Sequence, residues 1–306
     1  MAEVKRRKRS ALRSKDDFLM DTLAITVSAL VLLVVLYPLV YIVSCSFSEP
    51  AEVALGNVIL FPKGFTLEGY SYILDYDDIW LGYRNTIFYT VVGTIMNLIV
   101  TLPAAYALSR KDMPGNAIFT WVFASTMFFS GGLIPTYLVY KNLKMINTIW
   151  CMLIPGLISM WNTVVCRTYF SNSIPYELQE ASKIDGCGDI RLFLTIILPL
   201  SGPIIAVMTM YYAVGHWNAY FRAMIYLSKH DLYPLQLFLR NILLLDTTQD
   251  LIGADAETQR EVLRLAQLKE SMKFGIIVVS ALPMLIMYPF FQRFFVKGVM
   301  VGAIKG

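Results

Sequence analysis

The chain has 306 residues, 57% of them hydrophobic and 16% charged, with a formal net charge of +4. This composition is too apolar for a soluble domain of this length and indicates a membrane protein. Six apolar segments are long enough to cross a hydrocarbon core of about 30 Å, which takes roughly 20 helical residues. They are residues 21–46, 85–109, 117–140, 147–170, 192–227 and 273–295. We therefore predict an all-α integral membrane protein with six transmembrane helices.

A basic tail, residues 1–20, precedes the first segment and contains Lys5, Arg6, Arg7, Lys8, Arg9, Arg13 and Lys15. The positive-inside rule places this tail in the cytoplasm, and six spans return the C-terminus to the same side. The loops 47–84 and 228–272 are then external, whereas residues 171–191 are cytoplasmic. The tail could instead belong to a nucleic-acid-binding arm or a signal peptide. The apolar stretch after it is too long for a signal peptide and lacks a clear small-x-small cleavage site.

The third segment contains three small residues, Ser130, Gly131 and Gly132, followed by Pro135. Small residues let helices approach closely, and proline removes a backbone hydrogen bond, so this stretch predicts a local break or bend. A discontinuity at membrane depth is tolerated only beside protein or a water-lined cavity. The bend therefore shapes a solute pathway, acts as a hinge, or simply allows close helix packing.

The cytoplasmic loop and the start of the fifth segment carry landmarks in a fixed order, namely Glu180-Ala181, Gly186, Ile196 and Leu198-Pro199. This order and spacing resembles the EAA loop of ABC-importer membrane subunits. In that loop Glu-Ala-Ala is followed by a glycine and, about nine residues later, by isoleucine and Leu-Pro. Ser182 stands where the family has its second alanine, which replaces one small side chain by another. The alternative is an ordinary polar hairpin between membrane helices.

Local physical chemistry predicts a short helix in this loop. Ser173 is placed to cap it, with Pro175 in the first turn, where a missing N–H costs nothing. Glu177 and Glu180 lie near the positive end of the helix dipole. Gly186 ends the helix and lets the chain reverse. One face carries a weakly apolar stripe of mostly small side chains that suits close approach by a partner: Leu178, Ala181, Ser182 and Asp185.

In the family the corresponding element is a coupling helix, which lies parallel to the membrane and docks in a cleft of a cytoplasmic ATPase. The resemblance implies the same role for the coupling loop 171–191. It makes Glu180 the main charged contact and Gly186 the obligatory turn. The ATPase-coupling residues that it implies are Glu180, Ala181, Ser182, Asp185, Gly186, Leu198 and Pro199.

The fifth segment is longer than one span needs, so we expect it to be kinked or to extend beyond the bilayer. Polar groups within a membrane are costly unless they face protein or water, so His216, Asn218 and Arg222 should point inward. Aromatic rings beside them suit the C–H faces of sugars. An interfacial aromatic belt and ordinary helix packing are the alternatives. The candidate substrate path comprises Tyr211, Tyr212, His216, Trp217, Asn218, Tyr220 and Arg222.

Three further stretches extend the family resemblance: MFFSGGLIPTY (127–137), YYAVGHWN (211–218) and FVKGVMVGAIKG (295–306). They are similar to carbohydrate-type, maltose-permease-like ABC permeases, and in particular to their oligosaccharide or lipoprotein-type branch. The chain is thereby identified as a member of this family, with the ABC-importer permease (MetI-like) fold. The resemblance implies a permease domain over 21–295, with its core at 85–295. It also implies a cytoplasmic tail over 296–306 that contacts the ATPases through Gly298, Gly302 and Lys305.

The resemblance implies an importer of carbohydrates, oligosaccharides in particular, in a bacterial plasma membrane that the chain crosses several times. Its partners are then a homologous second permease, two cytoplasmic ABC ATPases and an extracellular or periplasmic solute-binding protein, all around a lipid bilayer. No nucleic-acid partner is expected. ATP and Mg are bound by the ATPases, because this chain has no phosphate-binding loop and needs no cofactor of its own.

The sequence contains no recognisable catalytic constellation, so we do not expect an enzyme. Its four cysteines and two histidines lack the paired spacing of a metal site: Cys45, Cys151, Cys166, Cys187, His216 and His230. An ion-coupled secondary transporter is the main alternative, but it needs intramembrane carboxylates, and the predicted spans have none near mid-membrane. A membrane enzyme such as a lipid-sugar transferase would need acidic or metal-binding clusters at one face.

Overall fold

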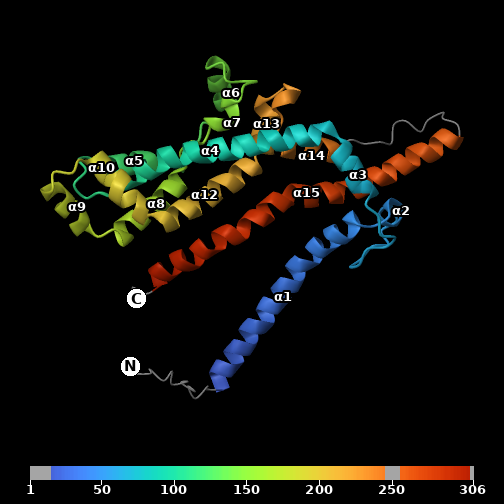
Figure 1. Ribbon diagram of the computed structural model, residues 1–306, viewed down its shortest axis with the longest axis horizontal. Helices are drawn as coiled ribbons and strands as arrows, with labels where there is room; N and C mark the ends of the chain where they lie inside the picture. Colours follow the sequence, from blue (N-terminus) through green and yellow to red (C-terminus); the bar gives the residue numbers. More distant parts are fainter. Residues whose placement is uncertain (1–14, 245–255, 304–306) are drawn as a thin grey trace. The chain divides into compact units, whose positions relative to one another are not determined.

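The computed structural model describes residues 15–244 and 256–303, and all regular elements within these ranges are helical (Figure 1). The chain forms two compact units. The first comprises residues 1–72 and 247–278, and the second comprises residues 73–246 and 279–306. Two helices, α3 (Glu68–Asp75) and α15 (Ala256–Ala303), contribute residues to both units.

The first unit is built on α1 (Lys15–Ser46) and α2 (Pro50–Ala54), together with the beginning of α15. Its small buried core contains Cys45, Val53 and Val58. Next to this core, the rings of Tyr41 and Phe274 pack edge to face with their centroids 5.7 Å apart. The side chains of α1 from residue 18 to residue 39 are all exposed. A long apolar helix with no cover of its own suits a lipid environment, as the first predicted span requires.

The second unit is organised around α4 (Asp77–Ser109), and α8 (Met160–Ser173) and α12 (Gly202–Trp217) pack along it (Figure 1). The buried side of α4 carries a stripe of small and polar residues, which lets neighbouring helices approach closely: Thr86, Thr90, Gly93, Thr94, Asn97 and Thr101.

The remaining elements of the second unit are short. They are α5 (Asn116–Ser125), α6 (Leu133–Asn142), α7 (Trp150–Leu153), α9 (Tyr176–Ile184), α10 (Asp189–Leu192), a π-helical turn η1 (Phe193–Ile197), α11 (Leu198–Leu200), α13 (Tyr220–Tyr226), a 3₁₀ turn η2 (His230–Leu232) and α14 (Leu235–Leu244). The helix α14 packs on α4 and α13.

Three of the described helices are long and apolar enough to cross a membrane, and they contain Phe18–Ser46, Asp77–Ser109 and Gln267–Gln292. A fourth span results if Asp189–Leu200 and Gly202–Trp217 are joined across a bend of 84°. The total of six spans therefore stays a prediction. Several helix ends differ from the sequence analysis. The helix α1 begins before residue 21, α4 begins well before residue 85, and α15 extends on both sides of 273–295.

Three of the predicted segments are broken. The break expected in the third segment is confirmed, because α5 ends at Ser125 and α6 begins only after Gly132, whose φ is +80°. The fifth segment bends at Ser201, as its length predicted, because Pro203 has no N–H to continue the helical ladder. The fourth segment was expected to be one apolar stretch, but the chain leaves the helix between α7 and α8, where Gly156 has a φ of +76°.

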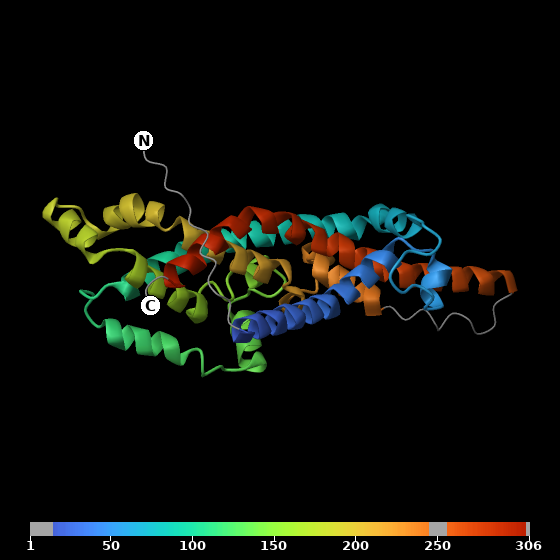
Figure 2. The ribbon, with the colours of Figure 1, turned by 90° about the horizontal axis from the view of Figure 1, so that it is seen from below.

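The helices α5 and α6 have no buried residue, and Figure 2 shows α5 separated from the other helices of its unit. The two phenylalanines between them, Phe128 and Phe129, are 82% and 81% exposed. Apolar side chains exposed to this degree need a lipid or protein environment. The exposed apolar side chains of α5, α6 and the loop between them are therefore expected to be covered by lipid or by another protein.

Candidate functional site

The predicted coupling helix is present as α9, but it begins differently from the prediction. Ser173 is the last residue of α8 and does not cap α9, so that assignment is wrong. The N-cap is Pro175, and Ile174 before it is extended, as the residue preceding a proline usually is. These two residues suffice to turn the chain from α8 into α9. Glu177 lies in the first turn of α9, as expected.

The stripe predicted on α9 is divided between two environments. Ser182 is buried and Leu178 is partly buried against the core, whereas Ala181 and Asp185 are exposed. The Oγ of Ser182 donates a hydrogen bond to the carbonyl of Leu178 at 2.7 Å, so its polar atom is satisfied within the helix. Ser182 therefore faces the interior of this chain and is not available to a partner. The exposed face, which we call the α9 face, comprises Glu180, Ala181, Ile184 and Asp185.

Gly186 ends α9 with a φ of +71°, as the sequence predicted. Its N–H donates to the carbonyl of Lys183 at 3.0 Å, and the N–H of Cys187 donates to that of Ser182 at 2.8 Å. This pair of bonds is the Schellman motif, which caps a helix end and reverses the chain. In the described part of the chain, no atom lies within 4 Å of a Cβ placed on Gly186, so its backbone conformation alone favours glycine.

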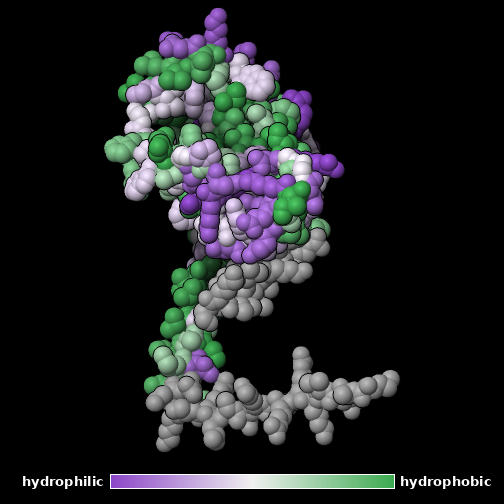
Figure 3. Space-filling model, turned by 90° about the vertical axis from the view of Figure 1, so that its left-hand side faces the viewer, coloured by the Kyte–Doolittle hydropathy of each residue, from purple (hydrophilic) through white to green (hydrophobic). Residues whose placement is uncertain are grey.

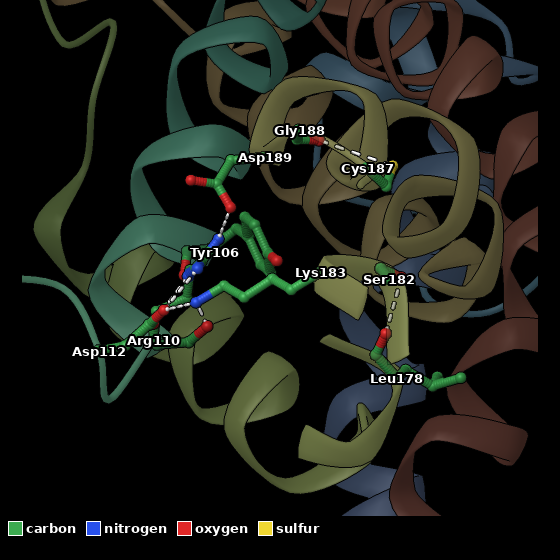
Figure 4. A network of polar contacts seen from close by, with 10 residues as sticks. Tyr106, Arg110, Asp112, Leu178, Ser182, Lys183, Cys187, Gly188 and Asp189 are labelled. Carbon is green, nitrogen blue, oxygen red and sulfur yellow. Dashed lines mark hydrogen bonds and ion pairs between the residues drawn. The ribbon is translucent and has the colours of Figure 1, made fainter. Parts of the chain in front are cut away.

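An ionic cluster joins the loop of α9 and α10 to the end of α4 (Figure 4). Arg110, which follows α4, donates from Nε and Nη2 to the two carboxylate oxygens of Asp112 at 2.9 and 2.6 Å. Its Nη1 also bonds the carboxylate of Asp189 at the start of α10. The Nζ of Lys183 on α9 lies 2.5 Å from the carboxylate of Asp112. Two cations and two carboxylates thus connect three segments.

The Arg110 guanidinium is the centre of this cluster. It is only 10% exposed as a side chain, and it lies over the ring of Tyr106 at 5.9 Å. Its two hydrogen bonds, followed by the hydrogen bond from Lys183, hold the pKa of Asp112 well below its usual range. The same carboxylate raises the pKa of Lys183 and is the largest cause of a raised pKa of Arg110. Arg110, Asp112 and Lys183 are therefore all charged at neutral pH.

A pocket of about 610 Å³ opens beside the cluster, with the charged groups on one side and mainly apolar walls around them. It is lined by Pro103, Tyr106, Ala107, Arg110, Asp112, Met113, Pro114, Lys183, Asp189, Ile190, Phe193 and Leu194. Figure 3 views the end of the unit that carries α9 and α10, where hydrophilic side chains gather. Ile184 and Ile190 are 86% and 78% exposed at the same end. A partner would meet both charged and apolar side chains there.

The other residues assigned to ATPase coupling lie elsewhere. Leu198 and Pro199 belong to α11, and Leu198 packs partly against the core. They are not part of the α9 face. Gly298 and Gly302, assigned to the tail, lie within α15, which continues to Ala303. Lys305 lies outside the described residues.

A second, smaller site is a polar cavity of about 120 Å³ next to α4 and α12. It brings together four of the seven substrate-path candidates, Tyr211, Tyr212, His216 and Arg222, with residues that the sequence analysis did not select, Asn97, Pro155, Gly156 and Gly215. The Nε2 of His216 and the Oδ1 of Asn97 are 2.7 Å apart. The hydroxyls of Tyr212 and Thr101 are also 2.7 Å apart.

The remaining three candidates do not line this cavity. Trp217 donates from Nε1 to the carbonyl of Ser280 at 3.0 Å and borders a separate apolar pocket of about 580 Å³. Asn218 was expected to point inward, but it is exposed and donates to the carbonyl of Val214 in its own helix. Tyr220 is 43% exposed. Neighbouring positions on a helix are rotated by about 100°, so one block of aromatic residues cannot all face one cavity.

Two groups of residues at these sites were missed from the sequence. Asn97 is a polar residue in the middle of a predicted span, which is itself a signal for a functional position. The regular spacing of polar residues from Thr86 to Thr101 would have identified the buried side of α4. The pairing of Arg110 with Asp189 joins residues 79 positions apart, and no local pattern indicates it. Among the described residues, no cluster of His, Cys, Asp or Glu is arranged to hold a metal ion.

Comparisons with known proteins agree with this architecture. The family model described as "Binding-protein-dependent transport system inner membrane component" matches residues 79–296. Protein LplC of Bacillus subtilis (strain 168) is 37% identical over 89% of this chain and 90% of its own length. The polygalacturonan/rhamnogalacturonan transport system permease protein YtcP of the same organism is 35% identical over 90% of this chain and 94% of its own length.

A solved structure matches the fold as well. It is a crystal structure of a bacterial ABC transporter involved in the import of the acidic polysaccharide alginate. The matched chain is 33% identical with a TM-score of 0.80, over 92% of this chain and 98% of that one. The chain described here therefore belongs to the binding-protein-dependent transport system inner membrane components, as a carbohydrate-type ABC-transporter permease that is a translocation subunit and not an enzyme.

Proposed function

We propose that this chain is the membrane-spanning permease subunit of an ATP-driven, binding-protein-dependent importer of oligosaccharides. The observation that supports this most directly is the exposed α9 face, which a charged cluster joins to α4, the same helix that lines the polar cavity. A force applied to α9 therefore reaches the residues around the cavity through one continuous helix. This connection is what a subunit needs to couple ATP hydrolysis to movement of a solute.

The assembly that follows has a homologous second permease, two cytoplasmic ABC ATPases and an external solute-binding protein. Each permease contributes one wall of the path, and the exposed helices α5 and α6 meet lipid or the second permease. ATP and Mg are bound by the ATPases. The chain crosses the bacterial plasma membrane six times with both ends in the cytoplasm, and the short, broken helices form part of these crossings. The α9 face docks on an ATPase through Glu180 and Asp185.

The test is uptake of labelled oligosaccharides into proteoliposomes that contain the complete complex, with ATP inside and binding protein outside. The double variant Glu180→Arg plus Gly186→Pro changes the charge of the α9 face and the end of the helix. We expect it to assemble and retain basal ATP hydrolysis, but to lose sugar-driven stimulation and uptake. Gly188→Ala is the matched control, because Gly188 has an ordinary φ of −73° and free space around it.

Full ATP-driven uptake by the double variant would contradict coupling through α9. Uptake by the unaltered complex that follows an ion gradient and ignores ATP would instead favour a secondary transporter.

A further inference from the structure

Arg222 on α13 carries a charge into the polar cavity. Its Nη1 donates to the carbonyl of Met152 at 3.1 Å. A guanidinium has five N–H donors, so most of its hydrogen-bonding capacity is left for another acceptor. Among the residues that the structure describes, no carboxylate lies within 4.0 Å of its nitrogens. A cation in a membrane segment is costly unless it meets water or an anion, so the cavity suits an anionic ligand.

The backbone around Gly156 keeps the guanidinium accessible. A Cβ on this residue would lie 3.5 Å from Nη2 of Arg222, and the φ of +76° favours glycine in any case. The carbonyls of Gly156 and Leu157 accept hydrogen bonds from Nδ2 of Asn97 at 2.9 and 2.8 Å. The backbone at Gly156 and Leu157 is therefore fixed in place with these carbonyls already satisfied, and Gly156 has no side chain to press against Arg222.

Other residues that line the cavity offer groups that suit a sugar ring. Nδ2 of Asn97 is a donor to two carbonyls, so its Oδ1 is the atom that accepts from Nε2 of His216. In the neutral imidazole this leaves Nδ1 as an acceptor for a hydroxyl. Tyr211 is 55% exposed and presents an aromatic ring. The cavity thus combines a cation, a hydroxyl acceptor and a ring.

We propose that this cavity holds the carboxylate of an acidic sugar, a uronate unit of an oligosaccharide, with Arg222 as its direct contact. The guanidinium fork matches a planar carboxylate and forms paired hydrogen bonds with it. The volume of about 120 Å³ admits the carboxylate and part of one sugar ring. This inference rests on the proposed importer function and specifies its substrate class.

The experiment compares uptake of a trigalacturonate with uptake of its methyl ester, which has the same rings but no charge. Both are delivered by the same binding protein at saturation, and uptake is divided by ATP hydrolysed. In Arg222→Gln we expect about a tenfold or greater loss for the acid, which is typical of losing a charged hydrogen bond, and no loss for the ester. Arg222→Lys retains the charge without the fork, so it should lose less.

Arg167→Gln is the matched control. Its Nε donates to the carbonyl of Leu108 at 2.8 Å, which is the same kind of bond, but Arg167 does not line the cavity. We expect this variant to transport both sugars like the unaltered complex. Assembly of every variant is checked by size-exclusion chromatography. If Arg222→Gln does not assemble, the ratio of acid to ester uptake in Arg222→Lys decides the question in the same way.

Acid uptake at the unaltered rate in Arg222→Gln would overturn this inference. An equal loss for acid and ester would also overturn it, because that result indicates that Arg222 only supports the structure. Preference of the unaltered complex for the ester would reject the acidic substrate while keeping the importer. Failure of the unaltered complex to import any sugar would instead reject the proposed function.

Discussion

The side chains of His216 on α12 and Asn97 on α4 meet through an Nε2 to Oδ1 distance of 2.7 Å, and both residues are buried. The same Asn97 amide donates to the carbonyls of Gly156 and Leu157. One asparagine therefore joins α4, α12 and the break between α7 and α8. This junction positions the wall of the polar cavity, and several consequences for stability and transport can be tested.

Gly93→Ala should disrupt this junction. A Cβ on Gly93 would lie 2.5 Å from Cε1 and Nε2 of His216, which is too close for any real contact. The ring must move and give up its bond to Asn97, so we expect a loss of about 1–3 kcal/mol in the free energy of unfolding. Thermal unfolding of the complex in nanodiscs measures this change.

The control for Gly93→Ala is Gly202→Ala at the start of α12, where no atom of the described residues lies within 4 Å of the added Cβ. Alanine in a helix is intrinsically more stable than glycine, so this variant should unfold at the same or a higher temperature. Equal melting temperatures for the two variants would mean that His216 does not depend on the space left by Gly93.

Gly186→Ala should weaken coupling without greatly affecting assembly. A non-glycine residue at a φ of +71° costs about 1–2 kcal/mol, although the added Cβ meets no atom. The end of α9 is then less stable, and sugar-stimulated ATP hydrolysis should fall by several-fold. Gly186→Asn should be milder, because asparagine tolerates this conformation better. The same hydrolysis rate in Gly186→Ala and Gly188→Ala would contradict this prediction.

Asp112→Asn should separate α9 from α4. The substitution keeps the shape of the side chain but removes the charge that holds both Arg110 and Lys183. We expect a loss of about 1–2 kcal/mol in stability and reduced uptake per ATP hydrolysed. Asp189→Asn is the comparison, because Asp189 is 68% exposed as a side chain against 27% for Asp112. A larger loss of stability in Asp189→Asn than in Asp112→Asn would show that burial of the carboxylate does not determine which contact matters more.

The stabilising effect of Asp112 should depend on pH only under acidic conditions. Its pKa in the folded chain lies below the ordinary value of 3.8, so the stabilisation is complete above about pH 4 to 5. It is lost as the pH falls through the lowered pKa, because protonation removes the charge. The difference in melting temperature between the unaltered complex and Asp112→Asn should therefore be constant from pH 5 to 8 and shrink below pH 4. A difference that changes near neutral pH would implicate another group.

The sequence predicted those features that depend on neighbouring residues. The break at Gly131 and Gly132, the end of α9 at Gly186 and the bend in the fifth segment all follow from the local chemistry of glycine, proline and segment length. The division of the α9 stripe was not predictable, since helical periodicity says which residues share a face but not whether that face is covered. Ser182 and Asp185 share the predicted stripe, yet only Ser182 is buried.

Contacts between distant segments were also beyond the sequence. His216 and Trp217 are adjacent, but His216 bonds to Asn97 while Trp217 bonds to the carbonyl of Ser280. The direction of each side chain depends on how α12 is rotated against α4, which is set by packing around small residues such as Gly93. A single charged residue such as Arg110 likewise gives no indication of which of many acids it will meet.

The bend at Ser201 affects how the chain enters the membrane during synthesis. The two arms, Asp189–Leu200 and Gly202–Trp217, are about 18 Å and 24 Å long at 1.5 Å per residue, so neither can cross a bilayer core of about 30 Å alone. The insertion machinery receives one apolar segment, but Pro203 removes one helical hydrogen bond near the bend, which is costly in lipid. Both α4 and α8, which pack against α12, precede it in the chain. The helices α4 and α8, against which α12 packs, are thus already synthesised when the bent segment leaves the ribosome.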